Sequence, residues 1–138
     1  MSLLIYSDGA SRGNPGHAAI AFLILGEDGT LLQSHSKYIG IGTNNQAEYA
    51  ALASALEAAS NLTGGEVTCH LDSELVAKQL NGKYRVNDSK LKAHWQQIRE
   101  LEKRFRRVTY ISIPREDCFI NQVDELANQA LDRIRSKM

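Results

Sequence analysis

Apolar residues alternate with polar ones, or run together, in three successive segments at the start of the chain. Leu3 to Asp8 alternates and is followed by a glycine. The next segment, His17 to Leu25, is almost continuously apolar, and Thr30 to Gly40 follows a turn cluster of glycines and acids. Such runs bounded by turn residues predict strands, and short connections predict antiparallel neighbours. The pattern therefore predicts an antiparallel meander whose first strand ends at Asp8.

After residue 42 the apolar positions recur every three or four residues, which is the period of a helix. Thr43 and Gln46 have the spacing of a capping box, in which two side chains bond the unpaired backbone N–H groups of the first turn. Alanine-rich sequence continues to about Ser60, and two glycines follow shortly after it. We therefore predict a helix from Thr43 to about Ser60.

The rest of the chain alternates between strand and helix patterns. The predicted elements are a strand, a short helix, a longer helix, a strand and a last helix, namely Glu66–Asp72, Ser73–Gly82, Asp88–Phe105, Val108–Pro114 and a segment with an apolar face from Val123 to Ile134. Trp95 lies on the apolar stripe of the longer helix and is predicted to pack in the core. Antiparallel strands followed by strand–helix units predict an α/β fold with a mixed sheet.

Size and composition narrow the class of protein. With 138 residues and 43% apolar content, the chain suits one domain, residues 1–138, and we expect a monomer. It has no apolar run of about 18 residues and no secretory signal pattern, so we expect no membrane contact and a cytoplasmic location. Cys69 and Cys118 lack metal-ligand spacing and are expected to be reduced thiols. Zero net charge argues against nucleic-acid binding by bulk charge but leaves a local basic patch open.

Four carboxylates lie at comparable places, near the ends of predicted strands or the starts of predicted helices. They are Asp8, Glu48, Asp72 and Asp124. In open α/β sheets these places converge on the ligand crevice. Clustered carboxylates repel one another unless cations bind them, and all-oxygen ligands suit Mg²⁺ or Mn²⁺. The alternatives are structural: a turn for Asp8, helix N-terminal positions for Asp72 and Asp124, and a solvated helix acid for Glu48.

The glycine-rich segment from Asp8 to Gly16 has the glycine content of a phosphate-binding loop. The Gly-Lys-Ser/Thr sequence of a P-loop does not follow it, and the next predicted element is a strand rather than a helix. Binding of a nucleotide in the P-loop manner is therefore not expected. The glycines either let backbone approach a ligand closely or simply turn the chain.

Four motifs in order carry a family resemblance: DGASRGNPG, TNNQAEYAAL, LDSELV and VDELANQAL. Together they resemble the type 1 ribonucleases H, especially compact archaeal and bacterial members, from about Leu4 to Leu131. The resemblance implies a five-stranded mixed sheet of order 3-2-1-4-5 with helices on both faces. It implies hydrolysis of the RNA strand of RNA/DNA hybrids, with products that carry 5′-phosphate and 3′-hydroxyl ends. It also implies that the four carboxylates named above hold two divalent cations, Mg²⁺ or Mn²⁺.

The resemblance also implies which residues contact the substrate. One set lies in the glycine-rich segment and is suited to ribose 2′-hydroxyls of the RNA: Ser11, Arg12, Gly13 and Asn14. Thr43 and Asn45 are expected to hold a DNA phosphate, while Asn44 reaches the minor groove with Asn14. The structural alternative for Asn44 and Asn45 is helix capping.

The chain departs from the family pattern in two places. The loop before Asp124 is about two residues longer than in many compact relatives and contains no histidine, the residue that assists product release in some members. Glu116 or Asp117 is predicted to take that role. The segment from Asn81 to Asp88 is too short for the basic protrusion that other members use, so binding of a hybrid is expected to be weaker and more sensitive to salt.

Two other functions remain open from the sequence. One is a related nuclease that cuts double-stranded RNA or a branched DNA junction, and the other is a non-catalytic nucleic-acid or protein-binding module of this fold. Retention of all four acids favours an enzyme, and the Thr-Asn-Asn segment with the glycine-rich segment favours the hybrid as substrate.

Overall fold

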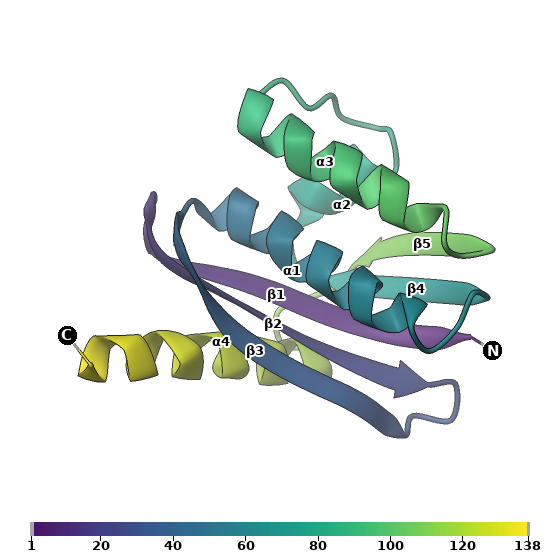
Figure 1. The fold of residues 1–138 in the computed structure, drawn as a ribbon, viewed down its shortest axis with the longest axis horizontal. Coiled ribbons are helices and arrows are strands. Elements are labelled where there is room, and N and C mark those ends of the chain that lie inside the picture. The colour runs from purple at the N-terminus through teal and green to yellow at the C-terminus, as the bar shows by residue number, and fades with distance from the viewer. Residues whose placement is uncertain (1, 138) are drawn as a thin grey trace.

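Five strands form one mixed sheet of order β3-β2-β1-β4-β5, which confirms the implied order (Figure 1). The computed structural model describes residues 2–137. The strands are β1 (Leu3–Gly13), β2 (Gly16–Gly26), β3 (Leu31–Gly42), β4 (Glu66–Leu71) and β5 (Arg107–Ser112). The first three pair antiparallel, whereas β4 pairs parallel with both β1 and β5. The meander and the mixed sheet predicted from the sequence are thus present.

Helices cover both faces of the sheet (Figure 1). They are α1 (Asn44–Ser60), α2 (Glu74–Leu80), α3 (Ser89–Glu102) and α4 (Cys118–Ser136). The core on one face joins the sheet to α1 and α3 around the buried side chains of Tyr49, Leu52 and Ile98. The core on the other face joins the sheet to α4 around Ile120 and Val123. Because β2 is buried on both faces, it reads as a continuous apolar run.

The first strand does not end at Asp8, contrary to the sequence-based prediction. It continues through the glycine-rich segment to Gly13, which pairs with Gly16 of β2. The parallel pairing with β4 stops earlier, at Tyr6. Asp8 therefore lies two residues beyond the last β1 residue that pairs with β4, Tyr6. It is in the middle of β1 rather than at its end.

Helix α1 begins as the capping box predicted. The Gln46 backbone N–H donates to Thr43 Oγ1 at 3.1 Å, and the Thr43 backbone N–H donates to Gln46 Oε1 at 2.9 Å. The box leaves Asn44 and Asn45 on the first turn, with their side chains available for contacts outside the helix. Local sequence thus places the start of α1 without help from the rest of the fold.

Helix α4 begins earlier than the apolar pattern suggested. Its N-cap is Asp117, whose Oδ1 accepts from the backbone N–H groups of Phe119 at 2.9 Å and Ile120 at 3.2 Å. Asp124 consequently lies in the second turn rather than at the start of the helix. The helix begins before Val123, the first residue of the predicted apolar face, because the N-cap residue Asp117 sets where it starts.

The predictions for the third helix hold in part. Trp95 is half-buried and packs against the core, as predicted. Phe105 is also buried in that core, but it lies beyond Glu102, where the helix ends. Within residues 2–137, no helix is long and apolar enough to cross a membrane.

Candidate active site

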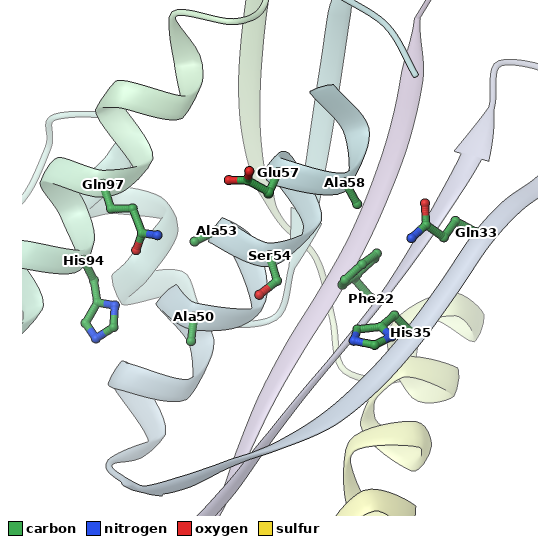
Figure 2. A pocket seen from close by; sticks show the side chains of 10 residues that line it. All are labelled: Phe22, Gln33, His35, Ala50, Ala53, Ser54, Glu57, Ala58, His94 and Gln97. Carbon is green, nitrogen blue, oxygen red and sulfur yellow. The ribbon is translucent and has the colours of Figure 1, made fainter. Parts of the chain in front are cut away.

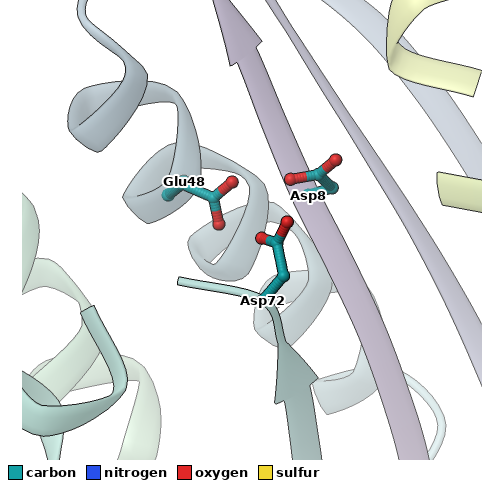
Figure 3. Close-up of side chains that lie close together, drawn as sticks. All are labelled: Asp8, Glu48 and Asp72. Carbon is teal, nitrogen blue, oxygen red and sulfur yellow. The ribbon is translucent and has the colours of Figure 1, made fainter. Parts of the chain in front are cut away.

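Three carboxylates from separate elements meet at one edge of the sheet. Asp8 comes from β1, Glu48 from α1 and Asp72 from the position after β4, and Figure 3 shows the three side chains turned toward one another. One oxygen from each lies within 4.8 Å of the others. They line a hollow of about 410 Å³ that Asp124 and Arg115 also line. The structure thus brings all four predicted acids to one hollow, with three of them in a tight group.

Close contact between β1 and α1 at Gly9 brings Glu48 to Asp8. The Gly9 backbone N–H donates to Glu48 Oε1 at 3.1 Å. A Cβ atom at residue 9 would lie 2.2 Å from the backbone carbon of Ala47 and 2.5 Å from the backbone nitrogen of Glu48. Only glycine allows this approach, so the glycine that follows Asp8 is part of the site's construction rather than a simple turn residue.

The acid group is buried and electrostatically unfavourable by itself. Asp8 is 2% exposed and Glu48 is 7% exposed. Burial, followed by the neighbouring Glu48 carboxylate, raises the pKa of Asp8 well above its ordinary value. Burial also raises the pKa of Glu48, against the opposing effect of the neighbouring Asp8 side chain. Both shifts mean that this arrangement disfavours negative charge on the two groups.

The donor set fits a divalent cation. Glu48 Oε2 is buried and has no hydrogen-bond partner among the described residues, although buried carboxylate oxygens are normally paired. A cation at this place would give that oxygen a partner and would offset the repulsion among the acids. Carboxylate oxygens are the ligands of hard ions, which agrees with the predicted type of metal.

Asp124 approaches the group from the opposite face of the sheet, on α4. After burial and the Glu48 and Asp72 carboxylates, Asp124 also contributes to the raised pKa of Asp8. Asn128, one turn further along, donates from Nδ2 to the Asp124 backbone carbonyl at 2.9 Å. Asp124 is nevertheless outside the three-residue group with the shortest mutual distances.

Sequence reasoning missed Arg115. Its Nε donates to Asp72 Oδ2 at 3.0 Å, and its side chain lines the hollow with the acids. Asp72, then Asp8 and Asp124, raise the pKa of the Arg115 guanidinium. Arg115 lies in an irregular loop, where neither a helical nor a strand pattern applies. The signal that could have identified it is its basic character in the loop that precedes Asp124.

The two loop acids predicted to assist product release lie elsewhere. Neither Glu116 nor Asp117 lines the hollow, and Asp117 uses Oδ1 to cap α4. The structure therefore gives Asp117 a structural role as the cap of α4, and assistance to product release by Glu116 or Asp117 stays a prediction. Arg115 is the residue of this loop that reaches the site.

Asp117→Ala is expected to lower the free energy of unfolding by about 1 kcal/mol, because two backbone N–H groups of α4 lose their acceptor. Asp117→Asn keeps an oxygen at that place and should remain close to the unaltered protein. Denaturant unfolding measures both. A role in product release would instead slow steady-state turnover in both variants, with no change in a single turnover.

The glycine-rich end of β1 is joined to the start of α1. The Ser11 backbone N–H donates to Asn44 Oδ1 at 3.0 Å, and the Asn44 backbone N–H donates to Asn14 Oδ1 at 3.0 Å. Ser11, Asn44 and Asn45 line the hollow with the acids. Asn14, Thr43, Asn44 and Asn45 line an adjoining groove of about 780 Å³ that reaches the first turn of α3. Five of the predicted contact residues thus form one surface beside the acids: Ser11, Asn14, Thr43, Asn44 and Asn45.

Arg12 and Gly13 stand apart from that surface. Arg12 Nη2 pairs with Asp132 of α4 at 2.6 Å and donates to the Asn128 carbonyl at 3.3 Å, and it lines neither the hollow nor the groove. Gly13 has a φ of +105° at the turn into β2 and accepts a hydrogen bond from the Ser11 hydroxyl through its carbonyl. Both residues therefore shape this end of the sheet, and the structure does not place them with the other predicted contacts.

Another hollow, of about 420 Å³, lies over α1 between α3 and the strands β2 and β3 (Figure 2). Its histidines, His35 and His94, come from opposite sides of α1. His35 packs against Phe22 with ring centroids 5.5 Å apart. None of the four acids lines it, so we take the acid-lined hollow as the candidate site.

The sheet order and the acid group define a ribonuclease H-like α/β protein, and comparisons with known proteins agree. The family described as reverse transcriptase-like matches residues 6–130. Ribonuclease HI of Halobacterium salinarum is 42% identical over 127 residues, which are 92% of this chain and 63% of that protein. The bifunctional protein Rv2228c of Mycobacterium tuberculosis is 37% identical over 133 residues, which are 36% of its length. The chain belongs to the type 1 ribonuclease H family.

Solved structures give the same result. The crystal structure of RNase H1 from Halobacterium salinarum superposes with a TM-score of 0.91 at 41% identity, covering 96% of this chain and 99% of that one. LC11-RNase H1, isolated from compost and crystallised in complex with an RNA/DNA hybrid, has a TM-score of 0.90 at 39% identity, covering 96% of this chain and 98% of that one.

Proposed function

We propose that this protein is a metal-dependent endoribonuclease that hydrolyses the RNA strand of RNA/DNA hybrids, leaving 5′-phosphate and 3′-hydroxyl ends. The observation that carries the proposal is the group of Asp8, Glu48 and Asp72, with oxygens within 4.8 Å of one another and one buried oxygen lacking a partner. Membership of the ribonuclease H family and the hybrid complex of LC11-RNase H1 support the choice of substrate.

In the proposed mechanism, Asp8 and Asp72 would share in holding two divalent cations, Glu48 would help to hold one and Asp124 the other. Mg²⁺ or Mn²⁺ would supply activation of a water molecule and stabilisation of the leaving 3′-oxygen. Glu48 would also lie beside a ribose 2′-hydroxyl of the RNA. The burial of Asp8 and Glu48 strengthens their interaction with cations, because little water competes for these oxygens.

The surface beside the acids would distinguish a hybrid from other duplexes. Ser11 and the amide groups of Asn14 and Asn44 would contact the minor groove and the 2′-hydroxyls, which only RNA carries. Thr43 and Asn45 would hold a phosphate of the DNA strand. Asn14 and Asn44 use their side-chain oxygens to accept from backbone N–H groups, so their amide nitrogens would serve as donors to the substrate.

Cleavage assays on four labelled substrates test the proposal. An RNA/DNA hybrid, double-stranded RNA, single-stranded RNA and double-stranded DNA are each incubated with Mg²⁺, with Mn²⁺ and with chelator. We expect cutting of the RNA strand of the hybrid alone, and only with a divalent cation. Cutting that persists in chelator would contradict the assignment of the acids.

The same assays test the other two functions considered from the sequence. Equal cutting of double-stranded RNA would indicate a broader nuclease, and hybrid binding with no cutting would indicate a non-catalytic module. We further propose that residues 1–138 act as one domain and as a monomer, which the sedimentation coefficient of the protein, alone and with a short hybrid, would test.

A further inference from the structure

Arg115 places a positive charge at the mouth of the acid-lined hollow. Its Nε lies 3.0 Å from Asp72 Oδ2, and the two side chains differ sharply in exposure, 72% for Arg115 and 9% for Asp72. The guanidinium is therefore mostly in solvent while its partner oxygen is inside. Because the guanidinium is largely solvated, its release from Asp72 costs little, and its position in the hollow suits it to contact a ligand there.

The charge of Arg115 extends over the whole acid group. Asp72, Asp8 and Asp124 each raise the pKa of Arg115, and Arg115 lowers the pKa of Glu48. Of the described residues that line the hollow, Arg115 is the sole cationic one. Within that lining, Arg115 thus supplies the positive charge that faces the four carboxylates.

A guanidinium and a divalent cation compete for the same carboxylate. Asp72 is one of the three acids whose oxygens lie close enough together to hold a cation, and Arg115 contacts one of its two oxygens. Two positive charges that share one carboxylate repel each other over a few ångströms. Because Arg115 is long and mostly exposed, it can turn away from Asp72 at little cost.

The backbone around Arg115 is held while the side chain can move. The Ile113 backbone N–H donates to the Leu71 carbonyl at 2.9 Å, and the Asp117 backbone N–H donates to the Pro114 carbonyl at 3.0 Å. These bonds fix the loop beside Asp72 on both sides of Arg115. The backbone of Arg115 therefore stays beside the hollow, within reach of a ligand there, when the guanidinium leaves Asp72.

We propose that Arg115 exchanges partners at this site: it releases Asp72 when divalent cations bind there and then holds a non-bridging oxygen of the phosphate that is cut. This inference rests on the proposed function. A guanidinium suits the second task because its planar fork offers two parallel N–H groups to a phosphate. Arg115 would then stabilise the negative charge that the phosphate carries during attack by water.

Metal titration without nucleic acid tests the competition. Free Mn²⁺ is measured by electron paramagnetic resonance as it is added to the full chain. Arg115→Ala is expected to bind Mn²⁺ about three- to tenfold more tightly, because the competing charge is gone. Arg115→Lys keeps a charge and should stay near the unaltered protein.

Arg104→Ala is the matched control for this titration. Arg104 forms a similar exposed ion pair, with Glu57 at 3.2 Å, and it does not line the hollow. Its loss should leave the affinity for Mn²⁺ unchanged. Equal or weaker Mn²⁺ binding by Arg115→Ala, compared with this control, overturns the proposal, since Arg115 would then not compete at Asp72.

Single-turnover cleavage of a hybrid at saturating cation tests the phosphate contact. Arg115→Ala is expected to cut at least about tenfold more slowly despite its tighter metal binding, and Arg115→Lys should fall in between, since an ammonium keeps charge without the fork. An unchanged rate in Arg115→Ala overturns the exchange. If the unaltered protein cuts no hybrid, the proposed function fails and the phosphate contact fails with it, while the Mn²⁺ titration still decides the competition at Asp72.

Discussion

Asp8→Asn is expected to lower cleavage of a hybrid by at least about 10²–10³-fold and, at neutral pH in chelator, to raise the free energy of unfolding by about 1–2 kcal/mol. The loss of activity follows from the central place of Asp8, which lies in the tight group with Glu48 and Asp72 and lines the hollow with Asp124. The gain in stability follows from its burial beside another carboxylate, which is costly for the folded protein.

The pH dependence has a definite sign. The pKa of Asp8 is raised in the folded protein, so the folded state keeps a proton that the unfolded state releases above pH of about 4. The free energy of unfolding of the unaltered protein therefore falls as the pH rises above about 4. The asparagine variant does not carry this dependence, and its advantage should grow between about pH 4 and pH 8.

Denaturant unfolding in chelator at several pH values, beside hybrid cleavage, measures both effects. Asp72→Asn should also abolish cleavage, whereas Asp124→Asn should be milder because Asp124 lies outside the tight group of three acids. Turnover retained in a folded Asp72→Asn variant would contradict the assignment of that residue. A stability advantage of Asp8→Asn that shrinks as pH rises would contradict the electrostatic account.

Gly9→Ala should damage both stability and activity, although it adds a single methyl group. The new Cβ would lie 2.2 Å from the Ala47 backbone carbon and 2.4 Å from its carbonyl oxygen, and backbone cannot turn aside as a side chain can. Helix α1 must therefore move away from β1. Overpacking of this kind costs about 1–3 kcal/mol, and we expect a loss of that size.

The same displacement carries Glu48 away from Asp8. Glu48 is bonded to the Gly9 backbone N–H, and a shift of about 1 Å in a catalytic group can reduce the rate about a hundredfold. Weakened binding of Mn²⁺ and slower cleavage should therefore accompany the loss of stability. Unchanged cleavage would show that the close approach at Gly9 is not needed to place Glu48.

Gly64→Ala is the matched control for this variant. A Cβ at Gly64 would meet only the Arg104 carbonyl oxygen, at 3.5 Å, which is an ordinary contact. The substitution should leave cleavage unchanged and should alter stability by less than about 1 kcal/mol. Comparison of the two variants separates the close approach at Gly9 from the general effect of replacing glycine by alanine.

Local rules predicted most of the elements but placed some of their ends wrongly. The Thr43–Gln46 capping box located the start of α1 because its two hydrogen bonds join residues three apart. Another local rule, that a glycine after an apolar run suggests a turn, wrongly predicted that β1 ends at Asp8. The strand continues because its partner, β2, comes from a later segment and offers hydrogen bonds as far as Gly16.

The sequence by itself determined the order of elements and the mixed sheet, and, through the motifs of its family, it singled out the four acids that line one hollow. Tertiary structure alone decided how these acids meet, that Arg115 pairs with Asp72 and that Arg12 turns to Asp132 on α4. The reason is physical: these contacts join residues 43 and 120 positions apart, and the Gly9–Glu48 bond spans 39. Neither side-chain periodicity nor capping extends so far along a chain, so only the packing of the whole fold sets those distances.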